Sequence, residues 1–153
     1  MDASKSSRVS NSKNQKEYRM AEVYEVSGSI GTDLYYCTIH WRNGNLFMDE
    51  PENLGGKDRG PDPMSTLLAS LAGCTLSTLR MYIDRKKWNV SKITVNLKMN
   101  REEKEGKVFT TIDRKIGFEG EISSEDRERL VVIATKCPVS KVLEGEVKIP
   151  TSL

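Results

Sequence analysis

The chain has 153 residues, of which 30% are charged and 37% are hydrophobic, and its net charge at pH 7 is +2. This length predicts one folded domain that can bury its own core. The near balance of 24 basic and 22 acidic residues argues against a nucleic-acid or anionic-membrane partner. With no long uninterrupted apolar run and no signal-peptide pattern, we expect a cytoplasmic protein that does not span a membrane.

The N-terminal stretch differs in composition from the rest of the chain. Residues 1–16 are polar and rich in Ser, Asn and Lys, and they lack the apolar side chains that a packed segment needs. We therefore expect a disordered polar tail at 1–16 and a single domain over 17–153.

The first third of the domain predicts a small antiparallel sheet. Residues 18–26 alternate between polar and apolar side chains, and residues 33–41 are rich in β-branched and aromatic types, so both are typical of strands. The segment 27–32 between them predicts a turn. The Asn-Gly pair within 42–45 is a strong hairpin signal, and residues 46–49 follow as the returning strand.

A long helix should follow the Gly- and Pro-rich loop at 50–63. Asp62 can cap a helix, and Pro63 suits its first position, where a missing N–H costs nothing. No helix breaker then occurs before Trp88. Apolar or small side chains cover most of this helix, which indicates a central place in the fold.

The second half predicts a hairpin, a helix and a final strand. Residues 91–103 alternate cleanly and 107–120 form their partner, with a turn between them. The segment 123–137 reads as a helix, with Ser124 as its capping candidate and Pro138 at its end. Residues 144–149 predict a last strand. The order of elements indicates an α+β fold with mainly antiparallel strands.

Three cysteines, Cys37, Cys74 and Cys137, are the residues most able to carry chemistry. Their odd number and long spacings favour free thiols in a reducing compartment over a disulfide framework. The chain has one histidine, His40. With one His and scattered Cys residues, no zinc-ligand spacing can be built, so we predict no metal site.

The three thiols differ in their sequence surroundings. Cys37 alternates within a strand and reads as a buried small hydrophobe. Cys74 lies in an apolar helix, where it could be a buried filler or a reactive thiol. Cys137 precedes Pro138 at a break between two helical segments, where the helix N-terminus and nearby lysines would lower its pKa.

Two stretches around these cysteines resemble a known family. The segments GPDPMSTLLASLAGCTLSTLRMY (60–82) and ATKCPVSKVLEGEVKI (134–149) are similar to the two cysteine motifs of the OsmC/Ohr family of thiol-dependent hydroperoxide reductases. DEPENLGG (49–56) resembles the family's approach to the first motif. The resemblance covers about residues 18–150.

The resemblance implies a fold, an activity and partners. The fold would be the family's OsmC-like α+β homodimer, with the two chains intertwined and their central helices packed together. Cys74 would match the peroxidatic cysteine, which reduces an organic hydroperoxide in oxidative-stress defence. Cys137 would match the resolving cysteine, and a dithiol or lipoyl-type reductant would restore both thiols. No cofactor is implied.

The pocket around Cys74 is where the chain departs from the family pattern. The family's hydroperoxide reductases carry a Glu nine or ten residues before the first cysteine, and here those positions are Ser65 and Met64. With Leu71 and Thr78 on the same helix, they would give an apolar substrate pocket. The family's activating Arg lies on an early strand, in the region of Tyr36 and Cys37 here, and no arginine stands there.

Several residues could replace this missing pair. Arg59 in the loop and Arg80 after Cys74 are the candidate cations, although a spacing of six residues keeps Arg80 from reaching Cys74 within its own helix. Asp49 or Glu50 could supply the acid, but neighbouring side chains on an extended segment point to opposite faces, so at most one of them would.

Two rival functions stay open at this level. The first is a dimer that binds a small apolar molecule without peroxidase turnover, which Met64 and Ser65 favour. The second is thiol or sulfur-group transfer that uses Cys137 as the thiol of low pKa.

Overall fold

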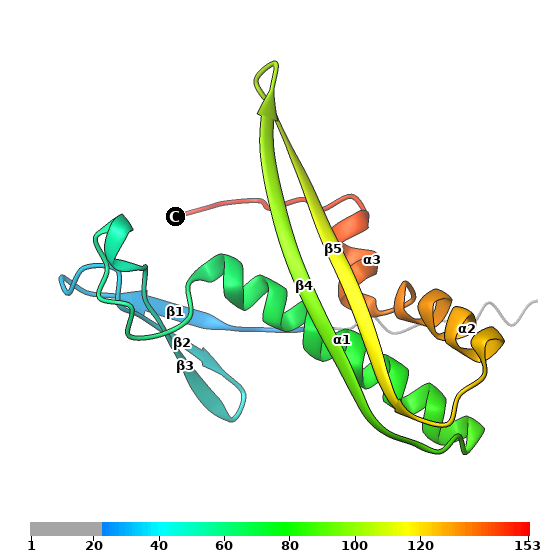
Figure 1. Cartoon of the computed structure of the whole chain (residues 1–153). Helices are drawn as coiled ribbons and strands as arrows, with labels where there is room; N and C mark the ends of the chain where they lie inside the picture. Colours follow the sequence, from blue (N-terminus) through cyan, green and yellow to red (C-terminus); the bar gives the residue numbers. More distant parts are fainter. Residues whose placement is uncertain (1–22) are drawn as a thin grey trace, which may run out of the picture.

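The computed structural model describes residues 23–153, so the tail expected at 1–16 lies outside the described residues. Its fold is α+β, with two antiparallel sheets and three α-helices, as expected (Figure 1). The elements are β1 Ser27–Ile30, β2 Cys37–Trp41, β3 Gly44–Met48, the short 3₁₀ helix Glu52–Leu54, α1 Pro63–Lys86, β4 Val90–Lys104, β5 Lys107–Gly120, α2 Ser124–Ala134 and α3 Pro138–Glu144.

The first strand lies later in the chain than we expected. The segment 27–30, where we expected a turn, pairs with β2 as strand β1. Within the expected strand 18–26, residues 23–26 are not in a strand, and the remainder lies outside the described residues. Gly28 allows this pairing, because a Cβ there would lie 2.7 Å from the Ile39 side chain on β2.

The hairpin between β2 and β3 confirms the Asn-Gly signal with a shifted turn. The turn residues are Arg42 and Asn43, and Gly44 already pairs with Trp41. A Cβ at Gly44 would lie 2.5 Å from the indole ring of Trp41. Glycine is therefore required here by the packing of the tryptophan.

Helix α1 begins where the sequence predicts. The side chain of Asp62 accepts hydrogen bonds from the backbone N–H groups of Met64 (2.9 Å) and Ser65 (3.0 Å), with Pro63 as the first helical residue. The helix ends at Lys86, and the next residue, Lys87, has a φ of 57° that stops the regular turn.

Strands β4 and β5 form one long hairpin that runs alongside α1, and its tip projects beyond the helices (Figure 1). Its two turn residues, Glu105 and Gly106, have φ values of 53° and 72°. Both positive angles belong to the tight turn that matches the twist of an antiparallel pair. The expected hairpin is confirmed.

The C-terminal segment contains two helices and no strand. The cap of α2 is Ser123, not Ser124, because the Ser123 hydroxyl accepts from the Asp126 N–H at 3.1 Å. Helix α3 begins at Pro138, as the break in the sequence suggested. The strand expected at 144–149 is wrong: α3 extends to Glu144, and residues 145–149 pair with neither described sheet.

The core lies between α1, α2 and the near end of the β4–β5 hairpin. Its buried members are Leu79, Ile83, Val90, Leu130 and Ala134. By length and composition α1 would also pass for a membrane-spanning helix. A single helix of this kind is equally typical of a protein core, and its buried stripe contributes to the one described here.

Candidate functional site

The fold brings Cys74 and Cys137 together. Cys74 lies in the middle of α1 and is half-buried, whereas Cys137 immediately precedes α3 and is fully buried. They are 63 residues apart in sequence, yet each appears among the groups that shift the pKa of the other. All three cysteines are free thiols. The two motifs singled out in the sequence therefore form one site.

The surroundings shift the two pKa values in opposite directions. Burial, followed by the interaction with Cys137, raises the pKa of Cys74, and the Val139 N–H and the Thr78 side chain offset this only in part. Burial alone would raise the pKa of Cys137 as well. The side chain of Cys74, the N–H and hydroxyl of Ser140, and the Val139 N–H together lower it.

Cys137 is thus the thiol that ionises first. It occupies the position that caps α3, although its sulfur makes no capping hydrogen bond, so the N–H groups of the first turn act on it over a longer distance. The proton stays on Cys74 while the negative charge is on Cys137. Cys74, however, is the more exposed sulfur. The pair can therefore exchange a proton between a buried base and an accessible nucleophile.

The four residues expected in the substrate pocket are divided by the structure. Thr78 interacts with Cys74 one turn further along α1, and Leu71 lines a cavity of about 210 Å³ that also contains Arg114 and Ser140. Met64 and Ser65 lie at the exposed start of α1. At about 1.5 Å per residue they are roughly 14 Å from Cys74 along the helix, so one chain does not bring them to the thiol.

Arg114 on β5 is a polar residue of the site that sequence reasoning missed. Its Nη1 donates to Thr75 Oγ1 at 2.9 Å, to the Ala134 carbonyl at 3.1 Å and to Ser140 Oγ at 3.1 Å. Thr75 follows Cys74 directly, and Ser140 is three residues after Cys137. The sequence did contain a signal for it. Side chains of β5 alternate between exposed and half-buried, and Arg114 lies on the half-buried face between Ile112 and Ile116.

The two arginines considered as substitutes are engaged elsewhere in the chain. Arg80 donates to Asp84 at 3.2 Å and to the Val90 carbonyl at 2.9 Å, near the end of α1. Arg59 bridges two carboxylates, Asp33 and Asp49, and its guanidinium lies 4.2 Å from the centre of the Tyr36 ring.

Asp49 is the buried member of the Asp49–Glu50 pair. The residue is 2% exposed, and its carboxylate accepts from Arg59 Nε at 2.7 Å and from the N–H groups of Glu50 and Lys57. These bonds tie the loop before α1 to the end of β3. The acid and the cation are thus paired with each other in the N-terminal half.

This junction should be sensitive to acid. Hydrogen bonds from Arg59 and Lys57 lower the pKa of Asp33 from 3.8 to about 2, and a hydrogen bond from Arg59 lowers the pKa of Asp49. Because both values are lower in the folded chain, their contribution to stability is complete above about pH 5 and is lost as the pH falls towards 2. We expect the difference in urea midpoint between wild type and Arg59→Met to be constant from pH 7 to about pH 5 and to shrink below that. A difference that persists unchanged at pH 2 would contradict this assignment.

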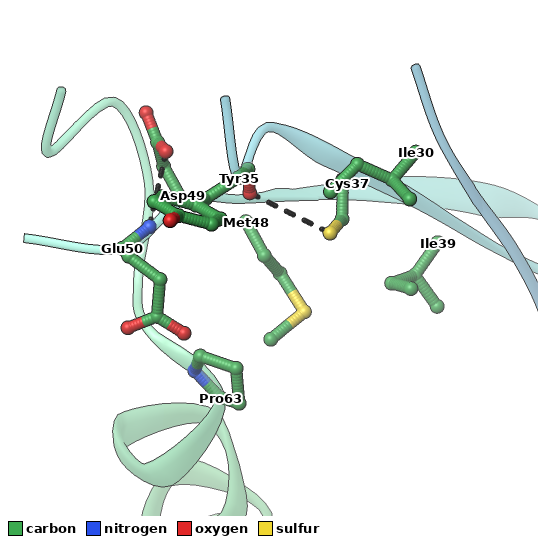
Figure 2. A pocket seen from close by; sticks show the side chains of 8 residues that line it. All are labelled: Ile30, Tyr35, Cys37, Ile39, Met48, Asp49, Glu50 and Pro63. Carbon is green, nitrogen blue, oxygen red and sulfur yellow. Dashed lines mark hydrogen bonds between the residues drawn. The ribbon is translucent and has the colours of Figure 1, made fainter. Parts of the chain in front are cut away.

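A second cavity, of about 340 Å³, lies between the N-terminal sheet and the start of α1 (Figure 2). Its lining is apolar apart from two acids and a thiol: Ile30, Tyr35, Cys37, Ile39, Met48, Asp49, Glu50 and Pro63. The Cys37 thiol donates to the Tyr35 carbonyl at 3.5 Å. Cys37 is therefore on the wall of a cavity of ligand size, on β2 of the N-terminal sheet, whereas the thiol pair lies on α1 and at the start of α3.

Within residues 23–153, no three His, Cys, Asp or Glu side chains gather as metal ligands. What the site contains is a pair of interacting thiols on two helices, with a guanidinium beside them. This arrangement defines a dithiol site.

The comparison with family models assigns the chain. The model described as OsmC-like protein matches residues 55–152, which is nearly two thirds of the chain and includes both cysteines of the pair. The protein belongs to the OsmC-like family. No curated protein sequence matches it significantly.

Solved structures of the same fold agree with this assignment. An OsmC-like protein from Mycoplasma pneumoniae is 21% identical with a TM-score of 0.70, covering 82% of this chain and 90% of its own. An organic hydroperoxide resistance protein OsmC from Legionella pneumophila is 19% identical with a TM-score of 0.63, and the match covers 82% of this chain and 93% of that protein. One from Elizabethkingia anophelis with bound thiocyanate is 22% identical with a TM-score of 0.64, covering 82% and 92%. At these identities the likeness concerns the fold.

Proposed function

We propose that the protein is a thiol-dependent peroxidase that reduces organic hydroperoxides in defence against oxidative stress. The observation that carries the proposal is the pairing of Cys74 with Cys137, one sulfur half-exposed and the other buried with a lowered pKa. Structural relatives named organic hydroperoxide resistance proteins support the substrate class. The apolar Leu71 beside the pair suits an alkyl chain.

The chemistry begins with a proton transfer. Cys137 takes the proton of Cys74, and the charge moves to the more exposed sulfur. The Cys74 thiolate attacks the distal oxygen of the hydroperoxide, and the O–O bond breaks. The departing alkoxide takes the proton back from Cys137 and leaves as the alcohol, so that Cys74 becomes a sulfenic acid.

The second step forms a disulfide. The Cys137 thiolate attacks the Cys74 sulfur, the S–S bond forms, and hydroxide leaves to become water on taking a proton. The two thiols have then supplied two electrons to the hydroperoxide. A dithiol of lipoyl type in the cytoplasm would return both electrons by thiol–disulfide exchange.

We infer that the working form is a homodimer. One face of α1 is exposed and carries the small residues Ser70, Gly73 and Ser77, with Met81 72% exposed beyond them. Small residues let a second helix approach closely. Phe109 on the projecting hairpin is also 54% exposed, which gives a second chain a further apolar surface.

Mass spectrometry tests the proposed chemistry directly. After one equivalent of cumene hydroperoxide, we expect the intact mass of the reduced protein to fall by two hydrogens and a Cys74–Cys137 cross-linked peptide to appear. The Cys37→Ser variant should behave in the same way, since Cys37 lies on strand β2, whereas the pair lies on α1 and at the start of α3. Unchanged thiols at positions 74 and 137 would refute the proposal.

That negative result would favour the alternative function, binding of a small apolar molecule. The cavity of about 340 Å³ beside Cys37 supports this alternative, because its size and apolar lining fit such a ligand. Retained apolar ligand in a native mass spectrum would then be expected.

A further inference from the structure

Arg114 connects the two thiol-bearing segments through a single nitrogen atom. The acceptors of its Nη1 belong to three helices: Thr75 on α1, Ala134 on α2 and Ser140 on α3. All three acceptor residues are buried. The Ala134 carbonyl also accepts from the Cys137 N–H at 3.3 Å. The guanidinium therefore holds the residues that flank both cysteines.

Among the described residues, this guanidinium forms an ion pair with no carboxylate. Among the ion pairs of residues 23–153, none includes Arg114. The three acceptors of Nη1 are neutral, although the Arg114 side chain is only partly exposed to solvent. A cation withdrawn from water is normally compensated by an anion. Glu144 and Arg114 both line the 210 Å³ cavity, but these two side chains do not form an ion pair.

The hydrogen bonds lead from Arg114 to a group that can become an anion. Ser140 Oγ accepts from Arg114, which leaves the one hydroxyl hydrogen free to be donated. Cys137 is the residue before α3 and Ser140 is the third residue of that helix, so the Ser140 hydroxyl lies one helical turn from Cys137, where it helps to lower the pKa of the thiol. A Cys137 thiolate would thus be the missing counter-charge, one hydroxyl away from the guanidinium.

We propose that Arg114 is a positioning residue for the thiol pair: through Ser140 it stabilises negative charge on Cys137, and through Thr75 and Ala134 it holds the two cysteine-bearing segments in place. The proposal rests on the proposed function only for its catalytic consequence. The charge state of the thiols in the reduced protein can be measured without any hydroperoxide.

Several other ionisable groups surround Cys137. Cys74 faces it from α1 and Arg114 lies behind Ser140 on β5. Glu144 is on α3, and Lys136 and Lys141 flank it in sequence. The two thiols titrate as a coupled pair, so the first ionisation step of the pair is the quantity to compare.

The test is a titration of thiolate ultraviolet absorbance in the Cys37→Ser background. We expect Arg114→Met to raise the lower apparent pKa of the pair by about one unit, as loss of a nearby opposite charge does. Arg114→Lys, which keeps the charge, should recover part of this shift. Lys115→Met, which removes an exposed neighbouring charge, should leave the titration unchanged.

A folded Arg114→Met protein with the wild-type titration would overturn the proposal. If that variant does not fold, Ser140→Ala decides, because it removes the connecting hydroxyl and keeps the bonds to Thr75 and Ala134. An unshifted Ser140→Ala titration would also overturn it. Suppose that Arg114→Met raises the lower apparent pKa of the pair, but the wild-type protein never reduces hydroperoxide. That result would refute the proposed function and leave the role of Arg114 intact.

Discussion

Cys74→Ser should lose single-turnover oxidation by cumene hydroperoxide by about 100-fold or more, since a serine hydroxyl stays protonated where a thiol ionises. Cys137→Ser lacks the base that takes the Cys74 proton, so its first step should depend on ionisation of Cys74 to solvent, and the reaction should stop at the sulfenic acid, which a dimedone adduct on Cys74 would reveal. Stopped-flow mixing of reduced protein measures both. A wild-type rate at or above about 10⁴ M⁻¹s⁻¹ would be within the range of competent enzymes.

The pH dependence of Cys137→Ser gives an independent check on the pair. The interaction with Cys137 is one cause of the raised pKa of Cys74, so its removal should shift the rise of the oxidation rate to lower pH. Loss of the reaction in Cys137→Ser together with its retention in Cys74→Ser would reverse the assigned roles.

Leu79→Ala should lower the free energy of unfolding by about 3 kcal/mol, the cost of emptying a fully buried leucine site. Leu79 is 0% exposed and lies in the core with Leu130 and Ala134 of α2. The same helix face carries Thr75, a contact of Arg114. Urea unfolding at a fixed protein concentration measures the change, because association of two chains would add to it.

Val131→Ala is the matched control for this core substitution. Val131 follows Leu130 on α2 and is 56% exposed, so we expect a change within about 0.5 kcal/mol. Equal losses in the two variants would mean that the core is not where the fold places it.

Local signals in the sequence predicted the features that depend on neighbouring residues. Asp62 and Pro63 determine the start of α1 through a cap and a fixed φ, and both act within one turn. Pro138 determines the start of α3 through its fixed φ alone, because Cys137 makes no capping hydrogen bond. The alternation over β4 and β5 predicted the hairpin, because one face of it packs towards the core.

Features that depend on distant partners were beyond sequence reasoning. Residues 27–30 are a strand because β2 pairs with them, although their Gly and Ser content suggests a turn. The segment 144–149 has strand-forming residues but pairs with no described strand. Arg114 is 40 residues after Cys74 along the chain, and only the tertiary fold lets its side chain reach Thr75, Ala134 and Ser140.

The isolation of Cys37 has a practical consequence. Two of the three thiols belong to the pair. The third, Cys37, donates a hydrogen bond to the carbonyl of Tyr35, two residues before it in the chain. An oxidant acting by the proposed route would consume two thiols per chain and spare the third. Cys37 thus serves as an internal standard: its remaining free thiol reports, in every sample, whether oxidation was confined to the pair or was indiscriminate damage.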